Sequence, residues 1–229
     1  MNKKPLINQK TIPYILIAPI VVIFALFMVY PIIRSLYLSF FELVSGSYEF
    51  VGFQNYVTLF KDETFWKSLF NTFIFLIVQV PVMIGGALLI AVAIEQKFIK
   101  GRAFFRTTIF LMIILMAGIQ SISNDLMEAA DIDGATFWHK LFYITIPMVK
   151  PIILFCTITS TIGTLQLFDE PYILTAGGPN YATITMGQYL YDNGFRYLKF
   201  GYASAIGYVM TVIIALLSVF QFKATKEEN

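Results

Sequence analysis

The sequence contains little charge for its length. Of its 229 residues, 13% are charged and 58% are hydrophobic, whereas an ordinary soluble domain is about 25% charged and roughly 45–50% apolar. A soluble fold of this size could not bury so much apolar surface and still present a polar coat to water. The composition therefore argues against a soluble enzyme or a disordered chain, and it favours a membrane protein with several spans.

Residue types that commonly form catalytic, disulfide or metal sites are also scarce. The chain has one cysteine, Cys156, and one histidine, His139, so it can form no internal disulfide and contains no H-E-x-x-H zinc motif. It also lacks the G-x-x-x-x-G-K-S/T loop that cradles the phosphates of ATP. We therefore expect no catalytic residue, no metal and no cofactor, and we interpret Cys156 as a packing residue. The net charge of +2 does not indicate a nucleic-acid partner.

Four uncharged hydrophobic stretches can cross a membrane. A helix needs about 20 mostly apolar residues to cross the roughly 30 Å hydrocarbon core, because each residue rises about 1.5 Å. The four stretches are residues 12–33, 69–94, 152–168 and 202–222. A fifth stretch, residues 104–119, contains Arg106, beyond which only about 20 Å of helix remains. The sequence predicts an all-α polytopic membrane protein, one domain over residues 1–229, with four spans and one short hydrophobic segment.

The placement of charged residues narrows the class of membrane protein further. No acidic or basic residue lies in the middle of any of the four spans, whereas proton-coupled carriers usually place Asp, Glu or His there. This argues against a proton-driven carrier. Lys3, Lys4 and Lys10 precede the first span, and the positive-inside rule therefore places the N-terminus in the cytoplasm.

The polar connection at residues 121–147 has the pattern of a helix-turn-helix. Asp125 and Glu128 have capping-box spacing, and Gly134 suits the left-handed turn that ends a helix. An apolar face then recurs at i, i+4, i+7 and i+11, in Phe137, Leu141, Ile144 and Met148. We expect a short helix, a turn, and an amphipathic helix at the membrane surface that is broken by Pro147 and Pro151. Such a loop suits docking to another protein or serves as a plain connector.

The same loop resembles a known motif. The spacing of Glu128-Ala129-Ala130, Gly134 and Ile144-Thr145-Ile146-Pro147 resembles the EAA motif of bacterial ABC importer permeases. Other stretches resemble the carbohydrate-uptake branch of that family, in particular its maltose, lactose and glycerol-phosphate permeases of the first-subunit type. They are residues 52–56 with Asn71-Thr72, residues 105–107, residues 174–179 and residues 201–205. The resemblance extends over nearly the whole chain from about Ile12.

The resemblance implies a function and its partners. The chain would be the permease subunit of an ATP-driven carbohydrate importer in the bacterial inner membrane. A second permease subunit, cytoplasmic ATP-binding subunits and an extracytoplasmic solute-binding protein would complete the importer, and the ATPase would be a separate chain. The residues that the resemblance assigns to ATPase coupling are Glu128, Ala129, Ala130, Asp133, Gly134 and Pro147.

The helix after the loop is the expected source of solute contacts, because the family takes some of its contacts from there. Thr157, Thr161 and Thr164 recur at i, i+4 and i+7, so one face of this helix is lined with hydroxyls. We expect Ser160, Thr164 and Gln166 to lie in the solute pathway. The alternative is that these hydroxyls bond to backbone carbonyls or join helices, as is common in membranes.

The sequence departs from the family at one place. Family members normally show a further loop and helix between the stretch at 105–107 and the stretch at 117–120, which are joined here. If residues 104–119 do not cross, eleven Lys and Arg residues lie inside and five outside; if they cross, the numbers are nine and seven. We expect four crossings with both termini inside. The alternatives are a transport-inactive permease paralogue and an ion-coupled secondary carrier.

Overall fold

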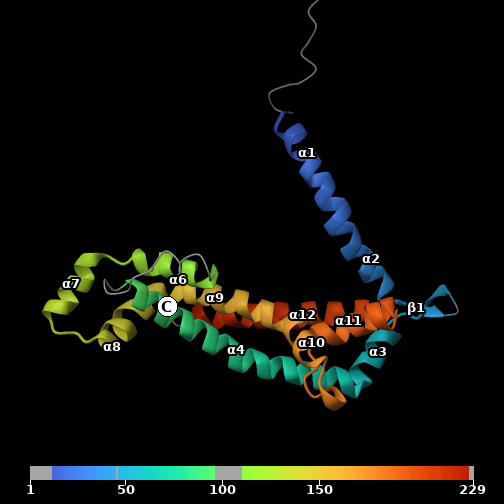
Figure 1. Ribbon diagram of the computed structural model, residues 1–229. Helices are drawn as coiled ribbons and strands as arrows, with labels where there is room; N and C mark the ends of the chain where they lie inside the picture. The colour runs from blue at the N-terminus through green and yellow to red at the C-terminus, as the bar shows by residue number, and fades with distance from the viewer. Residues whose placement is uncertain (1–11, 45, 96–109, 227–229) are drawn as a thin grey trace, which may run out of the picture. The chain divides into compact units, whose positions relative to one another are not determined.

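The computed structural model describes residues 12–44, 46–95 and 110–226. In this part of the chain four helices are long and apolar enough to cross a membrane: Pro13–Leu38, Glu63–Val92, Phe137–Leu165 and Phe200–Ala224. They correspond to the four predicted spans, and the helical architecture confirms the predicted fold class (Figure 1). The chain divides into two compact units, residues 1–62 with 190–209 and residues 63–189 with 210–229.

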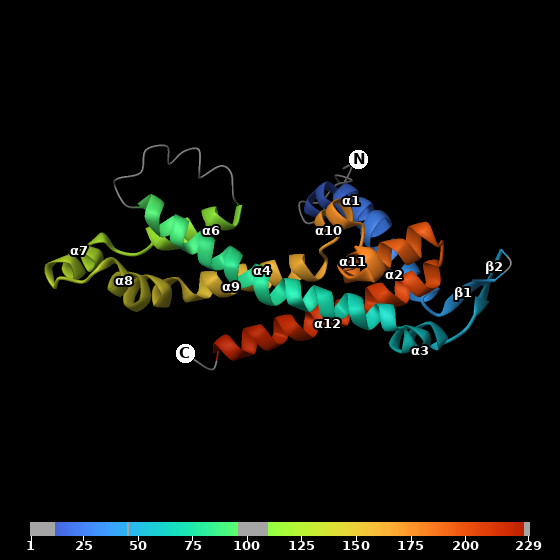
Figure 2. The same ribbon diagram turned by 60° about the horizontal axis from the view of Figure 1, so that its bottom comes forward.

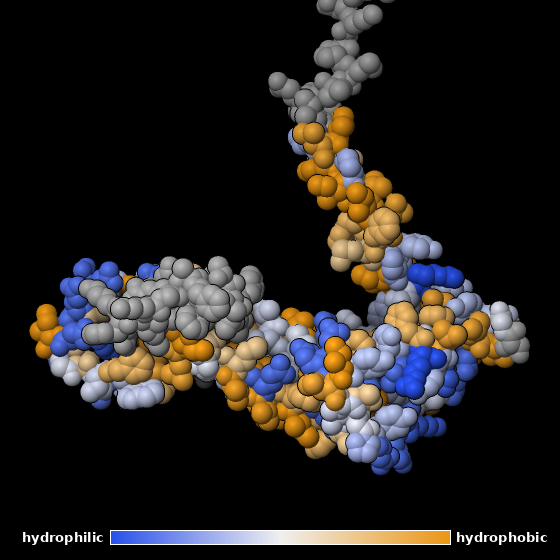
Figure 3. All heavy atoms as spheres, viewed as in Figure 1, coloured by the Kyte–Doolittle hydropathy of each residue, from blue (hydrophilic) through white to orange (hydrophobic). Residues whose placement is uncertain are grey.

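The first span is one apolar helix with a wide turn in its middle. It consists of α1 (Ile12–Phe24), the π turn η1 (Ala25–Val29) and α2 (Tyr30–Leu38). Pro31 follows the π turn by two residues, and the wider turn relieves the clash that a proline ring makes with the carbonyl four residues earlier. Apolar side chains cover the surface of this helix (Figure 3), as expected for a segment surrounded by lipid.

A small β-hairpin follows the first span, and the sequence did not predict it. β1 (Phe41–Val44) pairs antiparallel with β2 (Ser47–Phe50). The next helix, α3 (Gln54–Lys61), supplies the buried side chain of Asn55. Its amide donates to the carbonyl of Ser39 at 2.8 Å and to that of Phe41 at 3.0 Å. Asn55 thus fixes the end of the span to the start of the hairpin.

The last helix, α12 (Phe200–Lys226), begins in the first unit. A Cβ at Gly201 would overlap the carbonyl oxygen of Phe41, so only glycine allows this approach. The Tyr208 hydroxyl donates to the carbonyl of Ile32, and the Tyr202 hydroxyl donates to Asp62 at 3.2 Å. The first turns of α12 are therefore fastened to the first span and to the end of α3.

The second unit is built on three packed helices (Figure 2). α4 (Glu63–Glu95), α6 (Phe110–Gln120) and α9 (Ile146–Leu165) contact one another. A Cβ at Gly118 would overlap the side chain of Ile152, so this glycine lets α6 approach α9 closely. The buried core comprises Ala87, Leu88, Ala91, Leu115, Met116, Ile119, Ile122, Leu141, Val149 and Cys156. Cys156 is a buried packing residue, as predicted.

The described part of the fifth hydrophobic stretch is short. α6 has 11 residues, which amounts to about 16 Å of helix against a hydrocarbon core of roughly 30 Å. Residues 104–109 of the predicted segment lie outside the described residues. The number of crossings therefore stays a prediction.

The third span begins earlier than predicted. α7 (Asn124–Ile132) and a turn lead to α8 (Phe137–Lys140), the π turn η2 (Leu141–Thr145) and α9, which form one continuous helix from Phe137 to Leu165. The expectation that Pro147 and Pro151 break this helix is wrong. Pro147 follows the π turn by two residues, as Pro31 does in the first span, and the wide turn accommodates the ring.

Candidate functional site

The helix-turn-helix of the loop is present, with a different N-cap from the one predicted. Ser123, rather than Asp125, caps α7, and its hydroxyl accepts from the backbone N–H of Asp125 at 3.2 Å. Asp125 occupies the first turn, where an acidic residue complements the helix dipole. Thr136 caps α8, and its hydroxyl accepts from the N–H of His139.

The turn between the two helices depends on Gly134. Its φ of +77° lies in the left-handed region, which glycine adopts without steric cost. The N–H of Asp133 bonds to the carbonyl of Ala129 at 3.0 Å, and the N–H of Ala135 bonds to that of Ala130 at 2.9 Å. These bonds satisfy the last carbonyls of α7 and close the turn in the manner of a helix C-cap.

The predicted coupling residues do not all face outward. Glu128, Ala129, Asp133, Gly134 and Pro147 are exposed, whereas Ala130 is buried. Ala130 therefore packs inside the loop rather than at its surface. One exposed apolar residue was missed: Ile132, at the end of α7, exposes 86% of its surface. Its signal in the sequence was an apolar side chain between two aspartates, Asp131 and Asp133.

The loop is attached firmly to the core of the second unit. Ile122 and Leu141, which flank it, are members of the buried cluster, and Met127 and Phe137 pack against that cluster. Figure 3 shows hydrophilic residues gathered over α7, so the loop presents a polar surface above an apolar base. The loop is therefore packed against residues of α4, α6 and α9.

The hydroxyls of α9 divide into two groups. Thr157 and Thr159 donate to backbone carbonyls in their own helix, and Thr161 accepts from the Gln221 amide of α12 at 2.8 Å. These three support the alternative interpretation of the hydroxyl face. Ser160 and Thr164 are also buried, and the Ser160 hydroxyl has no hydrogen-bond partner within the described structure. Gln166 caps the end of α9 and is exposed.

The connection after α9 is a compact element fastened to α4. It contains α10 (Asp169–Thr175), the short 3₁₀ turn η3 (Pro179–Tyr181) and the start of α11 (Met186–Tyr191). Asn71 donates to the carbonyl of Ile184 at 3.0 Å, and the buried hydroxyl of Thr72 accepts from the N–H of Met186 at 3.0 Å. Lys67 donates to the carbonyl of Asn180 at 2.6 Å.

Two adjacent glycines shape this connection. Gly177 and Gly178 have φ values of +88° and +67°, a conformation that side chains disfavour. A Cβ at Gly178 would also lie 2.9 Å from the hydroxyl of Thr183. With glycine at this position, the Thr183 hydroxyl lies 2.7 Å from the Thr175 hydroxyl. The Gly-Gly-Pro stretch is thus a tight turn that folds the connection back on α10.

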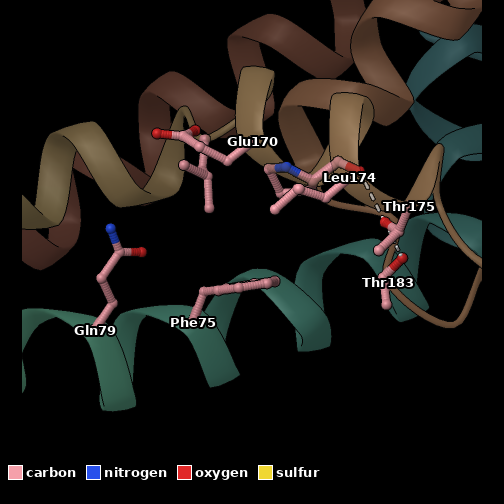
Figure 4. A pocket seen from close by; sticks show the side chains of 8 residues that line it. Phe75, Gln79, Glu170, Leu174, Thr175 and Thr183 are labelled. Carbon is pink, nitrogen blue, oxygen red and sulfur yellow. Dashed lines mark hydrogen bonds between the residues drawn. The ribbon is translucent and has the colours of Figure 1, made fainter.

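A pocket of about 190 Å³ lies between α4 and α10. We call it the α4–α10 pocket. Figure 4 shows Phe75 and Gln79 entering it from α4, opposite Glu170 and Leu174 of α10. Thr175 and Thr183 close one end, and the two remaining lining residues are apolar. Of the predicted solute residues Ser160, Thr164 and Gln166, none lines this pocket.

The family of the chain follows from comparison with known proteins. The family described as "binding-protein-dependent transport system inner membrane component" matches residues 60–224. This range is most of the 229-residue chain, and the chain therefore belongs to this family. It is a multi-pass permease subunit of the bacterial inner membrane, and it is not an enzyme.

Individual relatives align with most of the length of the chain. The lactose transport system permease protein LacF of Rhizobium radiobacter is 35% identical, over 94% of both chains. The sulfoquinovosyl glycerol transport system permease protein SmoG of Agrobacterium fabrum is 30% identical, over 89% of this chain and 87% of the relative. A crystal structure of a bacterial ABC transporter involved in the import of the acidic polysaccharide alginate has the same fold, with a TM-score of 0.76 at 20% identity over 96% of both chains.

The bond between Thr72 and Met186 yields a test of the fastened connection. Thr72→Val keeps the shape of the side chain but leaves the buried N–H of Met186 without its acceptor. We expect this change to lower the free energy of unfolding by about 1–3 kcal/mol. Thr72→Ser keeps the hydroxyl and should unfold close to the wild type in a thermal melt of the purified protein. Equal melting temperatures for the two variants would contradict this role of the hydroxyl.

Proposed function

We propose that this permease moves a carbohydrate into the cytoplasm by alternating access. The observation that carries the proposal is the family match over residues 60–224 together with the 35% identity to a lactose permease. The relatives compared above are named for solutes that contain a sugar. Uncharged hydroxyl and amide side chains in the core of the spans suit a solute with many hydroxyl groups, because they pair with it without burying a charge.

The family description implies a solute-binding protein as a partner. A related alginate transporter has been crystallised with its periplasmic protein bound. We further propose that a second permease subunit completes the pore and that cytoplasmic ATP-binding subunits drive it. The support for an external ATPase is that the chain itself has no phosphate-binding loop.

We assign ATPase docking to the exposed surface of α7 and its turn, which we call the coupling surface: Glu128, Ala129, Ile132, Asp133 and Gly134. Small residues at positions 129 and 134 let a partner approach the backbone closely. Ile132 offers an apolar contact, and Glu128 offers a charged one. Ala130 and Pro147 act differently, because Ala130 packs inside the loop and Pro147 lies in the first turn of α9, which carries motion into the membrane.

Substitutions at the turn test this assignment. Proline fixes φ near −65° and cannot adopt the φ of +77° at Gly134, so Gly134→Pro should displace α7 from its partner. Glu128→Lys should reverse the charge of the contact. We expect either change to reduce co-purification with the ATPase about tenfold or more, which corresponds to about 1.4 kcal/mol of binding free energy, with normal amounts of the permease in the membrane.

Gly134→Asn is the matched control. Asparagine tolerates a positive φ, and a Cβ at this position meets nothing within 4 Å. This variant should keep most of the ATPase association. Normal association and normal solute-stimulated ATP hydrolysis in both Gly134→Pro and Glu128→Lys would show that the ATPase docks elsewhere.

We propose that Ser160 and Thr164 contact the solute and that Gln166 lies at the outer end of its path. The support is that Ser160 and Thr164 are buried in α9 while their neighbours Thr157, Thr159 and Thr161 have partners inside the protein. A buried hydroxyl without a protein partner is costly. A solute hydroxyl or a water molecule can supply the missing bond.

Replacing these hydroxyls with an apolar side chain tests the path. Ser160→Leu and Thr164→Leu should lower the rate of sugar uptake by about tenfold or more, since a site built to bond a hydroxyl is sensitive to loss of that partner. Thr159→Leu is the matched control, because Thr159 is exposed and bonds only to Phe155 in its own helix. Uptake that is equal in all three variants, at equal amounts in the membrane, would mean that this face only packs.

Within the aligned region, the chain is shorter than its relatives. Its alignment with LacF extends over 281 positions, whereas the chain has 229 residues, so at least 52 aligned positions have no counterpart here. We propose that the missing helix and loop fall at the junction before residues 117–120. A transport-inactive paralogue remains the second candidate because of this shortening, and the intact coupling surface favours the active form. An ion-coupled carrier would not need that surface.

A further inference from the structure

The α4–α10 pocket has the size and the lining of a contact site for one small ring. Its volume of about 190 Å³ is below the roughly 300–1,000 Å³ of pockets that enclose a drug-sized ligand. It therefore has room for a single sugar ring and not for a whole oligosaccharide. Its lining is mostly apolar with a few polar groups, which is the usual composition of a small-molecule site.

Phe75 and Gln79 give the pocket two complementary surfaces. The ring of Phe75 lies along the floor of the pocket, and the Gln79 amide stands beside it (Figure 4). Gln79 occupies the middle of the 33-residue α4, and within the described structure its amide has no hydrogen-bond partner. An unpaired amide inside a membrane span costs free energy. A polyol supplies hydroxyls to the amide and an apolar C–H face to the aromatic ring.

The charge of the pocket is negative. Glu170 is the only charged residue among its eight lining residues, and its carboxylate has no ion-pair partner in the part of the chain that the structure describes. Lys67 bonds to the backbone of Asn180 and does not line the pocket. The Glu170 side chain is exposed at the pocket, where its carboxylate can accept hydrogen bonds from hydroxyl groups and repels an anion.

We infer that the α4–α10 pocket binds one ring of a neutral sugar and that Glu170 makes the permease discriminate against anionic solutes. This inference rests on the proposed function, because it specifies the class of carbohydrate that passes. The similar proteins differ in this property: one is named for lactose, an uncharged sugar, whereas another is described as importing the acidic polysaccharide alginate. The pocket places this chain with the transporters of neutral sugars.

Charged thiol reagents measure the potential of the pocket directly. In a Cys156→Ala background, Leu174→Cys places one thiol in the lining, because Leu174 is 80% exposed and borders the pocket. The assembled transporter in proteoliposomes is treated with a cationic or an anionic methanethiosulfonate. We expect the cationic reagent to react faster, and Glu170→Gln to lower the cation-to-anion ratio of rates about tenfold.

Asp169→Asn is the matched control. It removes a negative charge from the neighbouring residue of the same helix, and Asp169 does not line the pocket. We expect this variant to change the ratio of rates by less than about threefold, because Asp169 is not among the lining residues and the interaction of two charges weakens with distance and with salt. A ratio that is unchanged in Glu170→Gln, or that falls equally in both variants, would overturn the role of Glu170.

Protection by added sugars tests the ligand class. D-Glucose, D-galactose and L-arabinose are compared at equal concentration with D-glucuronate and D-galacturonate, which carry a carboxylate. At least one neutral sugar should slow modification of the Leu174→Cys thiol severalfold, and neither uronate should do so. Glu170→Gln should let the uronates protect. Equal protection by neutral and anionic sugars, or protection by none, would overturn the inference.

The thiol experiment is separable from the proposed function. Uptake by the same proteoliposomes, supplied with binding protein and ATP, reports whether any carbohydrate is transported. Uptake together with unchanged thiol chemistry in Glu170→Gln would refute the pocket and leave the proposed function standing. Absence of uptake of any carbohydrate by the wild-type complex would refute the proposed function itself.

Discussion

The thickness of the bilayer is the constraint on which the rest of this structure depends. A helix must be about 30 Å long to cross the hydrocarbon core, and four helices of the described chain satisfy this requirement. The described part of the fifth hydrophobic stretch, α6, has 11 residues, which is less than this length. Because α6 directly precedes α7, whether the fifth stretch crosses decides which side of the membrane carries the coupling surface. An odd number of crossings before the loop would put that surface outside the cell, away from any ATP.

Most of the short motifs by which the chain resembles its family hold the backbone in place. Asn55 ties the hairpin to the first span, Thr72 holds the connection after α9, and Gly201 permits α12 to approach β1. Thr72 lies within a span, where such a bond matters because water is not available to satisfy the backbone. The coupling surface is different, since its glycine has open space around it and its polar residues face outward. The scaffold is therefore fixed by buried bonds, while the partner contact remains accessible.

The spans and the turn at Gly134 could be predicted from sequence because hydropathy and a glycine C-cap are local signals. The continuity of the third span past Pro147 could not be predicted, because it depends on a π turn. No residue type predicts a π turn. The cap at Ser123 was missed because Asp125 offers the same chemistry two residues later. The hairpin and the α4–α10 pocket depend on contacts between distant residues, such as Asn55 with Phe41 and Gln79 opposite Glu170. Such contacts leave no periodic pattern in one sequence.

The sidedness of the loop is the most direct test of this account. In a Cys156→Ala background, Ile132→Cys places a thiol on the exposed end of α7, and Ala182→Cys places one after η3, where the backbone is ordinary and the side chain exposed. Intact cells are treated with a membrane-impermeant thiol reagent. The account predicts reaction at position 182, and reaction at position 132 only after the membrane is opened. Reaction at 132 and protection at 182 in intact cells would mean that the fifth segment crosses and that the coupling surface cannot meet a cytoplasmic ATPase.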